Sequence, residues 1–177
     1  VADTDDLTVF VVSKGLPQTN GSALHPLVCS GKPNNGNGTF NIMMSRPIVG
    51  ANLGYSGHGY EQYPYQEYKA YTDQPNFVDG KTHVITLTIS GVSTGGYGIL
   101  TGYYDGTLTE INNGDNLDPN NGPVDIGGDS LDTTRRFAGY LGDILIYDRV
   151  LSDNERNQVG WYLQEKYDVE GIYRNPQ

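Results

Sequence analysis

A strand followed at once by a capped helix, within residues 136–169, is the feature that most constrains this chain. The run Leu141–Tyr147 is rich in Ile, Leu and Tyr, which are favoured in β-strands. Because side chains alternate between the two faces of a strand, Ile144 and Ile146 share one face, and leucine and tyrosine side chains occupy the other. Both faces are therefore apolar, which predicts a strand covered on both sides.

The helix is predicted over about residues 152–167. Ser152 is a good N-cap, and Glu155 three residues later completes the pattern of a capping box. An apolar stripe at helical spacing follows, formed by Val159, Tyr162, Leu163 and Tyr167. Trp161 points nearly opposite to that stripe. The pattern predicts a helix packed across the edge of a sheet.

The same residues resemble a known family. The pattern from Phe137 to Tyr167, FxGxLGDILIYDRxLSxxERxxVxxYLxxKY, is similar to the C-terminal signature of bacterial laminin-G-like modules in the concanavalin A-like lectin/glucanase superfamily. Weaker similarities occur upstream, in the family's order, at residues 5–14, 82–91 and 123–128. The resemblance implies an all-β fold: a two-sheet antiparallel jelly-roll sandwich with one C-terminal helix.

Further strands are predicted from hydrophobic patterns. Leu7–Lys14 is apolar on both faces, so we expect a central strand. Thr82–Ser90 alternates cleanly, so we expect a half-buried strand, with a packed and hydrogen-bonded His83 at the head of its apolar face. Asp105-Gly106 between two β-rich runs predicts a hairpin with a type I′ turn. Shorter strands are expected at residues 27–29, 40–45, 53–55, 124–127 and from residue 65 onward.

One domain is expected, spanning residues 1–170. Its first strand begins almost at the first residue, whereas the family that the chain resembles usually has further sequence, including a strand, before it. We therefore expect either a fragment of a larger protein, with other domains of that chain as partners, or a shortened version of the module that lacks the upstream segment. Residues 171–177 are expected to be a loose tail or the remnant of a linker.

The charge balance limits the classes of partner. There are 21 acidic and 11 basic residues, which gives a formal net charge of −10. Phosphate binding requires clustered Lys and Arg, so nucleic acids and anionic membranes are not expected as partners. No stretch approaches the ~20 apolar residues of a transmembrane helix, so no membrane insertion is expected. The single cysteine, Cys29, excludes an intrachain disulfide.

Tyrosines crowd together between residues 55 and 71. Aromatic faces can stack on sugar rings while the hydroxyl groups form hydrogen bonds. The candidate ligand-binding residues are therefore His58, Tyr60, Tyr63, Tyr65, Tyr68 and Trp161. A structural role is the alternative, because tyrosines also cover half-exposed sheets. Trp161, the only tryptophan, also suits packing against missing upstream sequence or a neighbouring domain.

A structural Ca²⁺ is the one cofactor that the sequence suggests. Asp143 lies in an otherwise apolar strand face and so needs a partner, either a cation or hydrogen-bond donors. Calcium prefers carboxylate and carbonyl oxygens, but no EF-hand spacing occurs in this chain. The superfamily that the chain resembles often holds calcium between loops at one sheet edge. This makes Asp143, Asp129 and Asp132 the candidate metal ligands.

No catalytic residues are predicted. Glucanases of the superfamily carry ExDxE or ExDxxE on one strand face, and that pattern does not occur in the sequence. The nearest pair, Glu61 and Glu67, has no aspartate between its members. Residues 67–74 are faintly similar to a Tyr-x-Lys-Ala motif of jelly-roll alginate lyases, but the other motifs of those lyases are missing.

The sequence thus predicts a non-catalytic carbohydrate-binding or adhesion module of a secreted or cell-surface bacterial protein, with a polysaccharide or glycan as partner. One alternative is a polysaccharide-degrading enzyme, a lyase or glycosidase, on the same fold. Such an enzyme would present a groove lined by converging ionisable groups. A second alternative is a structural or protein–protein interaction domain, which would present a flat apolar patch instead.

Overall fold

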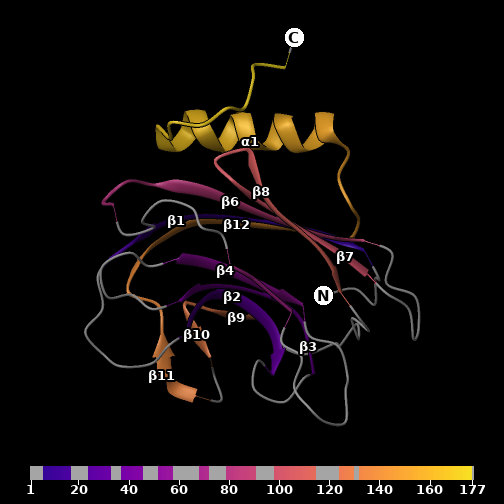
Figure 1. The fold of residues 1–177 in the computed structure, drawn as a ribbon. Coiled ribbons are helices and arrows are strands. Elements are labelled where there is room, and N and C mark those ends of the chain that lie inside the picture. The colour runs from indigo at the N-terminus through magenta and orange to yellow at the C-terminus, as the bar shows by residue number, and fades with distance from the viewer. Residues whose placement is uncertain are drawn as a thin grey trace.

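Three layers make up the described chain: two β-sheets stacked face to face, and one helix on the outer face of the first sheet (Figure 1). The computed structural model describes residues 6–16, 24–32, 37–45, 52–57, 68–71, 79–90, 98–114, 124–129 and 132–176. Within these residues every strand pairing is antiparallel. The predicted all-β jelly-roll sandwich with one C-terminal helix is confirmed.

Each of the two large sheets has five described strands. The first sheet has the order β12-β1-β6-β7-β8, from β1 (Leu7–Gly15), β6 (His83–Ser90), β7 (Gly98–Tyr104), β8 (Thr107–Gly114) and β12 (Gly139–Tyr147). The second sheet has the order β5-β4-β3-β2-β9, from β2 (Leu24–Lys32), β3 (Asn37–Ser45), β4 (Asn52–Gly57), β5 (Tyr68–Tyr71) and β9 (Val124–Ile126). Strands β10 (Gly128–Asp129) and β11 (Asp132–Arg136) pair with each other in a small two-stranded ribbon. The short predicted strands all coincide with these elements.

Strands β1 and β6 are neighbours in the first sheet and are buried on both faces. Their register places Val11 opposite Ile85. The prediction of a central strand is confirmed for β1. For β6 the prediction of a half-buried strand is wrong, because Val84 and Thr86 on its second face are also fully buried. The helix layer covers that face, and threonine on a strand does not distinguish a covered face from an exposed one.

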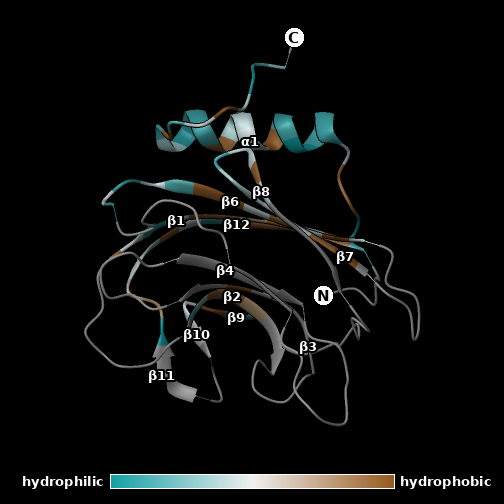
Figure 2. Ribbon diagram, in the orientation of Figure 1, coloured by the Kyte–Doolittle hydropathy of each residue, from teal (hydrophilic) through white to brown (hydrophobic). Residues whose placement is uncertain are grey.

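Two apolar cores result from the three layers. The first lies between the sheets and contains Leu7, Val9, Val11, Leu27, Val28, Ile42, Ile85, Leu87, Ile89, Leu100 and Tyr104. The second lies between the first sheet and the helix and contains Phe10, Val12, Val84, Leu151, Leu163, Val169 and Tyr173. In Figure 2, hydrophobic residues of β1 and β6 are coloured brown in the layer under the helix, whose surface is largely hydrophilic. Full burial of one such side chain contributes about 1.5–3 kcal/mol.

Strand β12 forms one edge of the first sheet. Ile144 and Ile146 pack on the core between the sheets, while Leu145 and Tyr147 pack on the core under the helix. The predicted cover on both faces is therefore confirmed. The strand is nevertheless only partly buried, because within the described sheet it has a neighbour on one side alone.

The helix α1 (Asp153–Tyr167) begins as predicted. The Ser152 hydroxyl accepts a hydrogen bond from the Glu155 backbone N–H at 3.4 Å, and the Glu155 carboxylate accepts one from the Ser152 N–H at 2.9 Å. Arg149 forms an ion pair with the same carboxylate at 2.6 Å. The Arg149 guanidinium, together with the Ser152 N–H and hydroxyl groups that donate to this carboxylate, lowers the pKa of Glu155 to about 2. The capping box is thereby confirmed.

The predicted stripe of α1 is confirmed for Val159, Leu163 and Tyr167, which pack on the core under the helix. Gly160 and Leu163 are its buried residues, and Tyr162 is 54% exposed. The helix lies across the face of the first sheet rather than across its edge (Figure 1). Arg156 lies over the ring of Tyr103 in β7, at 4.1 Å from the ring centroid. Tyr162 is the one member of the predicted stripe that lies outside this packing face, and the face also includes Gly160 and Arg156, which hydrophobic spacing does not select.

The segment after α1 packs against the fold. Val169 and Tyr173 are each 7% exposed and belong to the core under the helix. The Tyr173 ring fills the space beside Gly160, and its hydroxyl lies 3.3 Å from the Thr86 hydroxyl. Burial raises the pKa of Tyr173 to about 12. The expectation of a loose tail is therefore wrong for residues 171–173, because a buried tyrosine anchors them.

Candidate functional site

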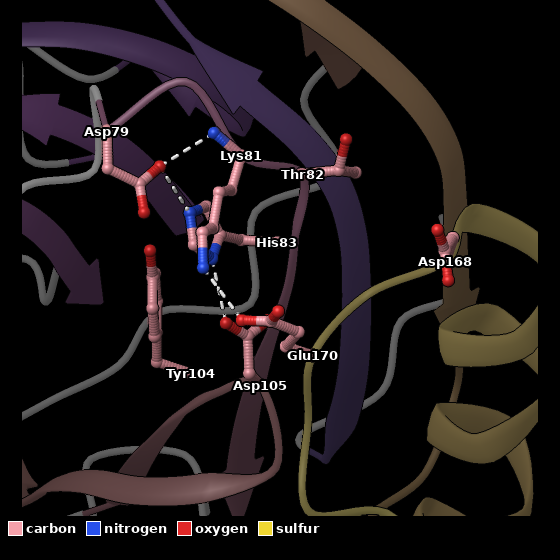
Figure 3. Close-up of a pocket in the computed structure, with 8 residues that line it drawn as sticks. All are labelled: Asp79, Lys81, Thr82, His83, Tyr104, Asp105, Asp168 and Glu170. Carbon is pink, nitrogen blue, oxygen red and sulfur yellow. Dashed lines mark hydrogen bonds and ion pairs between the residues drawn. The ribbon is translucent and has the colours of Figure 1, made fainter.

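A pocket of about 370 Å³ lies beside the start of β6 (Figure 3). Three segments far apart in the sequence line it: the turn before β6, the β7–β8 turn, and the chain after α1. The lining residues are Asp79, Lys81, Thr82, His83, Tyr104, Asp105, Asp168 and Glu170. Its volume falls within the ~300–1,000 Å³ range of small-molecule sites.

The β7–β8 turn supplies Asp105. Asp105 and Gly106 have φ of 49° and 84°, so the predicted type I′ hairpin turn is confirmed. The Asp105 backbone N–H donates to the Val84 carbonyl at 2.9 Å, and its carboxylate accepts from the Val84 N–H at 2.7 Å. The Asp105 carbonyl accepts from the Ile172 N–H at 3.1 Å. One turn residue thus ties the hairpin to β6 and to the C-terminal segment.

The turn before β6 supplies Asp79. Gly80 adopts φ of 85°, and the Lys81 backbone N–H donates to the Asp79 carboxylate at 2.8 Å. Burial alone would raise the pKa of Asp79, but this N–H and the His83 ring outweigh it and the pKa is lowered. Asp79 is therefore ionised at neutral pH.

His83 lies between the two aspartates, as Figure 3 shows. Its Nδ1 is 2.7 Å from the Asp105 carboxylate and its Nε2 is 3.1 Å from that of Asp79. Its ring stacks on Tyr104, with centroids 4.6 Å apart. Burial lowers the pKa of His83, but Asp105 first and Asp79 second outweigh this cost, and the pKa is raised. The prediction of a packed, hydrogen-bonded histidine is confirmed.

Lys81 and Glu170 form an ion pair of 2.7 Å at the mouth of the pocket. Their side chains are 60% and 85% exposed, so the contact is open to solvent. The Glu170 hydrogen bond raises the pKa of Lys81, and Lys81 lowers that of Glu170. The ammonium group of the pocket is thus already paired with a carboxylate.

The pocket is suited to hydrogen bonding rather than to acid–base catalysis. Both ring nitrogens of His83 contact carboxylates, so this imidazole is not a general base for a ligand. Asp79 has a lowered pKa and is therefore a poor proton donor at neutral pH. Carboxylate, ammonium and hydroxyl groups remain at the surface of the pocket for a polar ligand.

The candidate ligand-binding residues are scattered. His58, Tyr60, Tyr63 and Tyr65 lie outside the described residues. Tyr68 begins β5, where its backbone pairs with Gly57. Trp161 is partly buried and packs on the core under the helix. That contact agrees with the structural alternative considered for Trp161, although its partner is this domain's own core.

The three candidate metal ligands lie in two places. Asp129 and Asp132 are opposite each other in the β10–β11 ribbon. Asp143 is on β12, where the Lys166 ammonium of α1 lies 2.7 Å from its carboxylate. The sequence predicted that Asp143 needs either a cation or hydrogen-bond donors as a partner, and in this structure the Lys166 ammonium is that partner. The hydrogen bond from Lys166 lowers the pKa of Asp143. Among the described residues, no group of three or more His, Cys, Asp or Glu side chains is arranged to hold a metal ion.

Sequence inspection did not single out the pocket. Asp79-Gly80 and Asp105-Gly106 carry turn signals, and that role is sufficient to explain both aspartates. Lys81 and Glu170 are ordinary surface residues by sequence. Only His83, at the head of an apolar strand face, gave a signal that a polar cluster had to lie nearby.

Comparison with known families identifies the superfamily of this chain. A model of the concanavalin A-like lectin/glucanases superfamily matches residues 10–155. A comparison with curated proteins gives no match. Separately, no helix in the described part of the chain has both the length and the apolar character needed to cross a membrane.

Solved structures share the fold at low sequence identity. The Ruminococcus gnavus IT-sialidase CBM40, bound to alpha2,6 sialyllactose, is 15% identical with a TM-score of 0.59, and the match covers 86% of this chain and 81% of that chain. A botulinum neurotoxin type C structure is 15% identical with a TM-score of 0.60, covering 90% and 36%. The NanB sialidase from Streptococcus pneumoniae is 14% identical with a TM-score of 0.60, covering 86% and 23%. The chain therefore spans little more than a third of the toxin chain and less than a quarter of the NanB chain.

Proposed function

Because the chain belongs to the concanavalin A-like lectin/glucanases superfamily, we propose that it is a non-catalytic carbohydrate-binding module of a secreted or cell-surface protein. Two structures with the same fold support a glycan as partner. The Ruminococcus gnavus module is bound to alpha2,6 sialyllactose, and the cell entry of botulinum neurotoxin type C depends on interaction with two ganglioside molecules. The fold also carries other activities, so the choice among functions rests on the site.

The observation that carries the proposal is the polar pocket beside His83. It is large enough for one or two sugar rings, and its walls offer carboxylates, an ammonium group and a threonine hydroxyl. Sugar hydroxyl groups donate to carboxylates and accept from ammonium groups, so this lining matches their chemistry. The proposed binding surface includes this pocket.

The contacts of His83 with two carboxylates support binding without catalysis. A glycosidase requires two carboxyl groups, one of which is protonated when it acts as the acid. In the pocket, Asp79 is ionised and contacts His83, and Asp105 contacts both His83 and the Val84 N–H. Asp105 therefore stabilises the hairpin and the imidazole rather than facing a glycosidic bond. A lyase would need a base free to remove a proton, and both nitrogens of His83 are engaged.

The tyrosine-rich stretch is a second part of the proposed surface. Tyr60, Tyr63, Tyr65 and Tyr68, with His58, are proposed to supply stacking faces for the glycan. Trp161 is the weakest member of this set, because its ring packs on the core. Replacing Tyr63 and Tyr65 with Ala should abolish glycan binding while the melting temperature is retained; unchanged binding would place the stacking surface elsewhere.

A structural Ca²⁺ also remains a proposal, with Asp129, Asp132 and Asp143 as its candidate ligands. The test is the melting temperature with added Ca²⁺ and with EDTA, for the wild type and for Asp129→Asn, Asp132→Asn and Asp143→Asn. Bound calcium predicts that EDTA lowers the melting temperature and that one of the variants loses this effect. No response of the wild type would contradict calcium binding.

The proposed function is tested on a glycan array, with an assay for reducing ends and unsaturated products on every glycan that is bound. Thr82→Trp should fill the pocket and reduce binding at least tenfold, whereas Gln158→Trp, on the exposed face of α1, should not change it. Binding without product formation supports the module. Product formation would show an enzyme instead, and the absence of binding to any glycan would favour a structural domain.

A further inference from the structure

We infer that the pocket beside His83 takes uncharged sugars and rejects anionic ones, such as sialylated, uronic-acid or sulfated glycans. The inference rests on the proposed function and adds the chemical class of the ligand. A preference for uncharged sugars would distinguish this chain from the module of the same fold that is bound to alpha2,6 sialyllactose, an anionic glycan.

The first argument is the charge of the lining. Among the described residues that line the pocket, carboxylates are carried by Asp79, Asp105, Asp168 and Glu170, and the cationic side chains are Lys81 and His83. Even with His83 protonated, two negative charges are not balanced within the pocket. Of the lining residues that the structure describes, none is an arginine, the side chain best suited to bidentate recognition of a carboxylate or sulfate.

The second argument is that both cationic groups already have partners. The Lys81 ammonium is 2.7 Å from the Glu170 carboxylate. The two nitrogens of His83 contact Asp105 and Asp79 at 2.7 and 3.1 Å. Both nitrogens of His83 are engaged by carboxylates, and an anionic sugar bound to the Lys81 ammonium would have to share it with the Glu170 carboxylate, which repels the sugar's own negative charge. A neutral sugar can instead donate its hydroxyl groups to the same carboxylates without any loss of charge pairing.

The expected size of the discrimination follows from Coulomb's law. Two uncompensated charges within a few ångströms of a ligand anion, at the intermediate dielectric of an open pocket, weaken its binding on the order of tenfold or more. Added salt screens such exposed charges. The preference for the neutral sugar should therefore decrease as the salt concentration rises.

Glu170 is the residue through which the preference can be changed. Its side chain is 85% exposed, so replacement with Gln leaves the cores intact. Glu170→Gln removes one negative charge and releases the Lys81 ammonium. Asp168 is the αL C-cap of α1, with φ of 52°, a conformation that Asn also tolerates, so Asp168→Asn removes a second charge without strain.

The experiment compares the binding of matched neutral and anionic probes. The pairs are lactose with alpha2,6 sialyllactose and galactotriose with trigalacturonic acid, and an array of related neutral and anionic polysaccharides extends the comparison. The wild type is expected to bind neutral members on the order of tenfold or more tightly than their anionic partners. The Asp168→Asn/Glu170→Gln variant is expected to lose most of this difference. Glu165→Gln, an exposed carboxylate of α1 outside the pocket, is the matched control and should keep it.

The outcomes separate the inference from the proposed function. Anionic probes bound as tightly as neutral ones, with binding lost in Lys81→Gln, would overturn the inference and leave the carbohydrate-binding function standing. A neutral preference that Asp168→Asn/Glu170→Gln does not change would also overturn it, because the discrimination would then lie outside this pocket. A lack of binding to every probe of both classes would overturn the proposed function and the inference together.

Discussion

Among single residues, His83 has the most demanding surroundings. It is 5% exposed, yet it contacts two carboxylates and stacks on Tyr104. A buried charge is tolerated only when it is paired and hydrogen-bonded, and the two carboxylates beside His83 provide both conditions for its protonated form. Its two partners come from different turns, so one side chain connects the turn before β6 to the β7–β8 turn.

We expect His83→Gln to lower the free energy of unfolding by roughly 1–3 kcal/mol near pH 6, because Asp105 and Asp79 lose their charged donor. The pKa of His83 is raised in the folded protein from its usual 6.5. The contribution is therefore complete below about pH 6.5 and is lost as the pH rises through the folded pKa. Asp79 has a lowered pKa and stays ionised over this range. Urea unfolding of both proteins between about pH 5.5 and 9 measures the difference.

The sign of that pH dependence is the decisive result. A difference between wild type and His83→Gln that shrinks toward alkaline pH agrees with a protonated histidine in the folded state. A difference that grows with pH would mean that folding favours the neutral ring, and the two short contacts would then need another explanation. Tyr140→Phe, at an exposed position of β12, is the control. The difference in the free energy of unfolding between this variant and the wild type should be the same at each pH measured.

At the scale of elements, α1 depends on a glycine. A Cβ atom at Gly160 would lie 2.1 Å from the Tyr173 ring, well inside van der Waals contact. Gly→Ala in a helix interior normally stabilises by about 1 kcal/mol. Here we expect Gly160→Ala to destabilise by roughly 1–3 kcal/mol, because the Tyr173 ring must move out of its place in the core. Denaturant unfolding at constant pH measures the change.

A double-mutant cycle identifies the cause of the Gly160 effect. In a Tyr173→Leu background the ring is absent, so Gly160→Ala should cost much less there than in the wild type. Gln158→Ala, at an exposed position of the same helix, is the matched control for helix propensity and should be neutral or slightly stabilising. A full cost of Gly160→Ala in both backgrounds would contradict the packing explanation.

Local sequence patterns predicted the strands, the turn and the helix well, and contacts with residues distant in the sequence explain where the predictions were wrong. Ser152 and Glu155 interact three residues apart, so the capping box and the start of α1 could be found from the sequence. Asp105-Gly106 likewise encodes its own turn. Tyr162 was placed on the packing stripe wrongly, because the buried face is set by Gly160 and by a tyrosine beyond the helix end. Hydrophobic spacing within one element contains no information about such a partner.

At the scale of the whole molecule, the pocket exists only because distant segments meet. Its lining residues come from three segments, 79–83, 104–105 and 168–170, and none of these segments carries a recognisable site motif. The sequence therefore predicted the fold, while it placed the candidate ligand contacts in the tyrosine-rich stretch. The meeting of the segments is a property of the two cores, and in particular of the C-terminal residues that return over the first sheet.

Tyr173 should therefore affect both stability and the pocket. Its side chain is 7% exposed in the core under α1, so Tyr173→Ala is expected to lower the free energy of unfolding by about 3 kcal/mol. Because Asp168 and Glu170 lie on the segment that Tyr173 anchors, glycan binding should weaken under conditions where the variant is still folded. Asn175→Ala, exposed two residues later, should change stability by less than ~0.5 kcal/mol and leave binding intact. A Tyr173→Ala protein as stable as the Asn175→Ala protein would contradict the anchoring role of the Tyr173 ring.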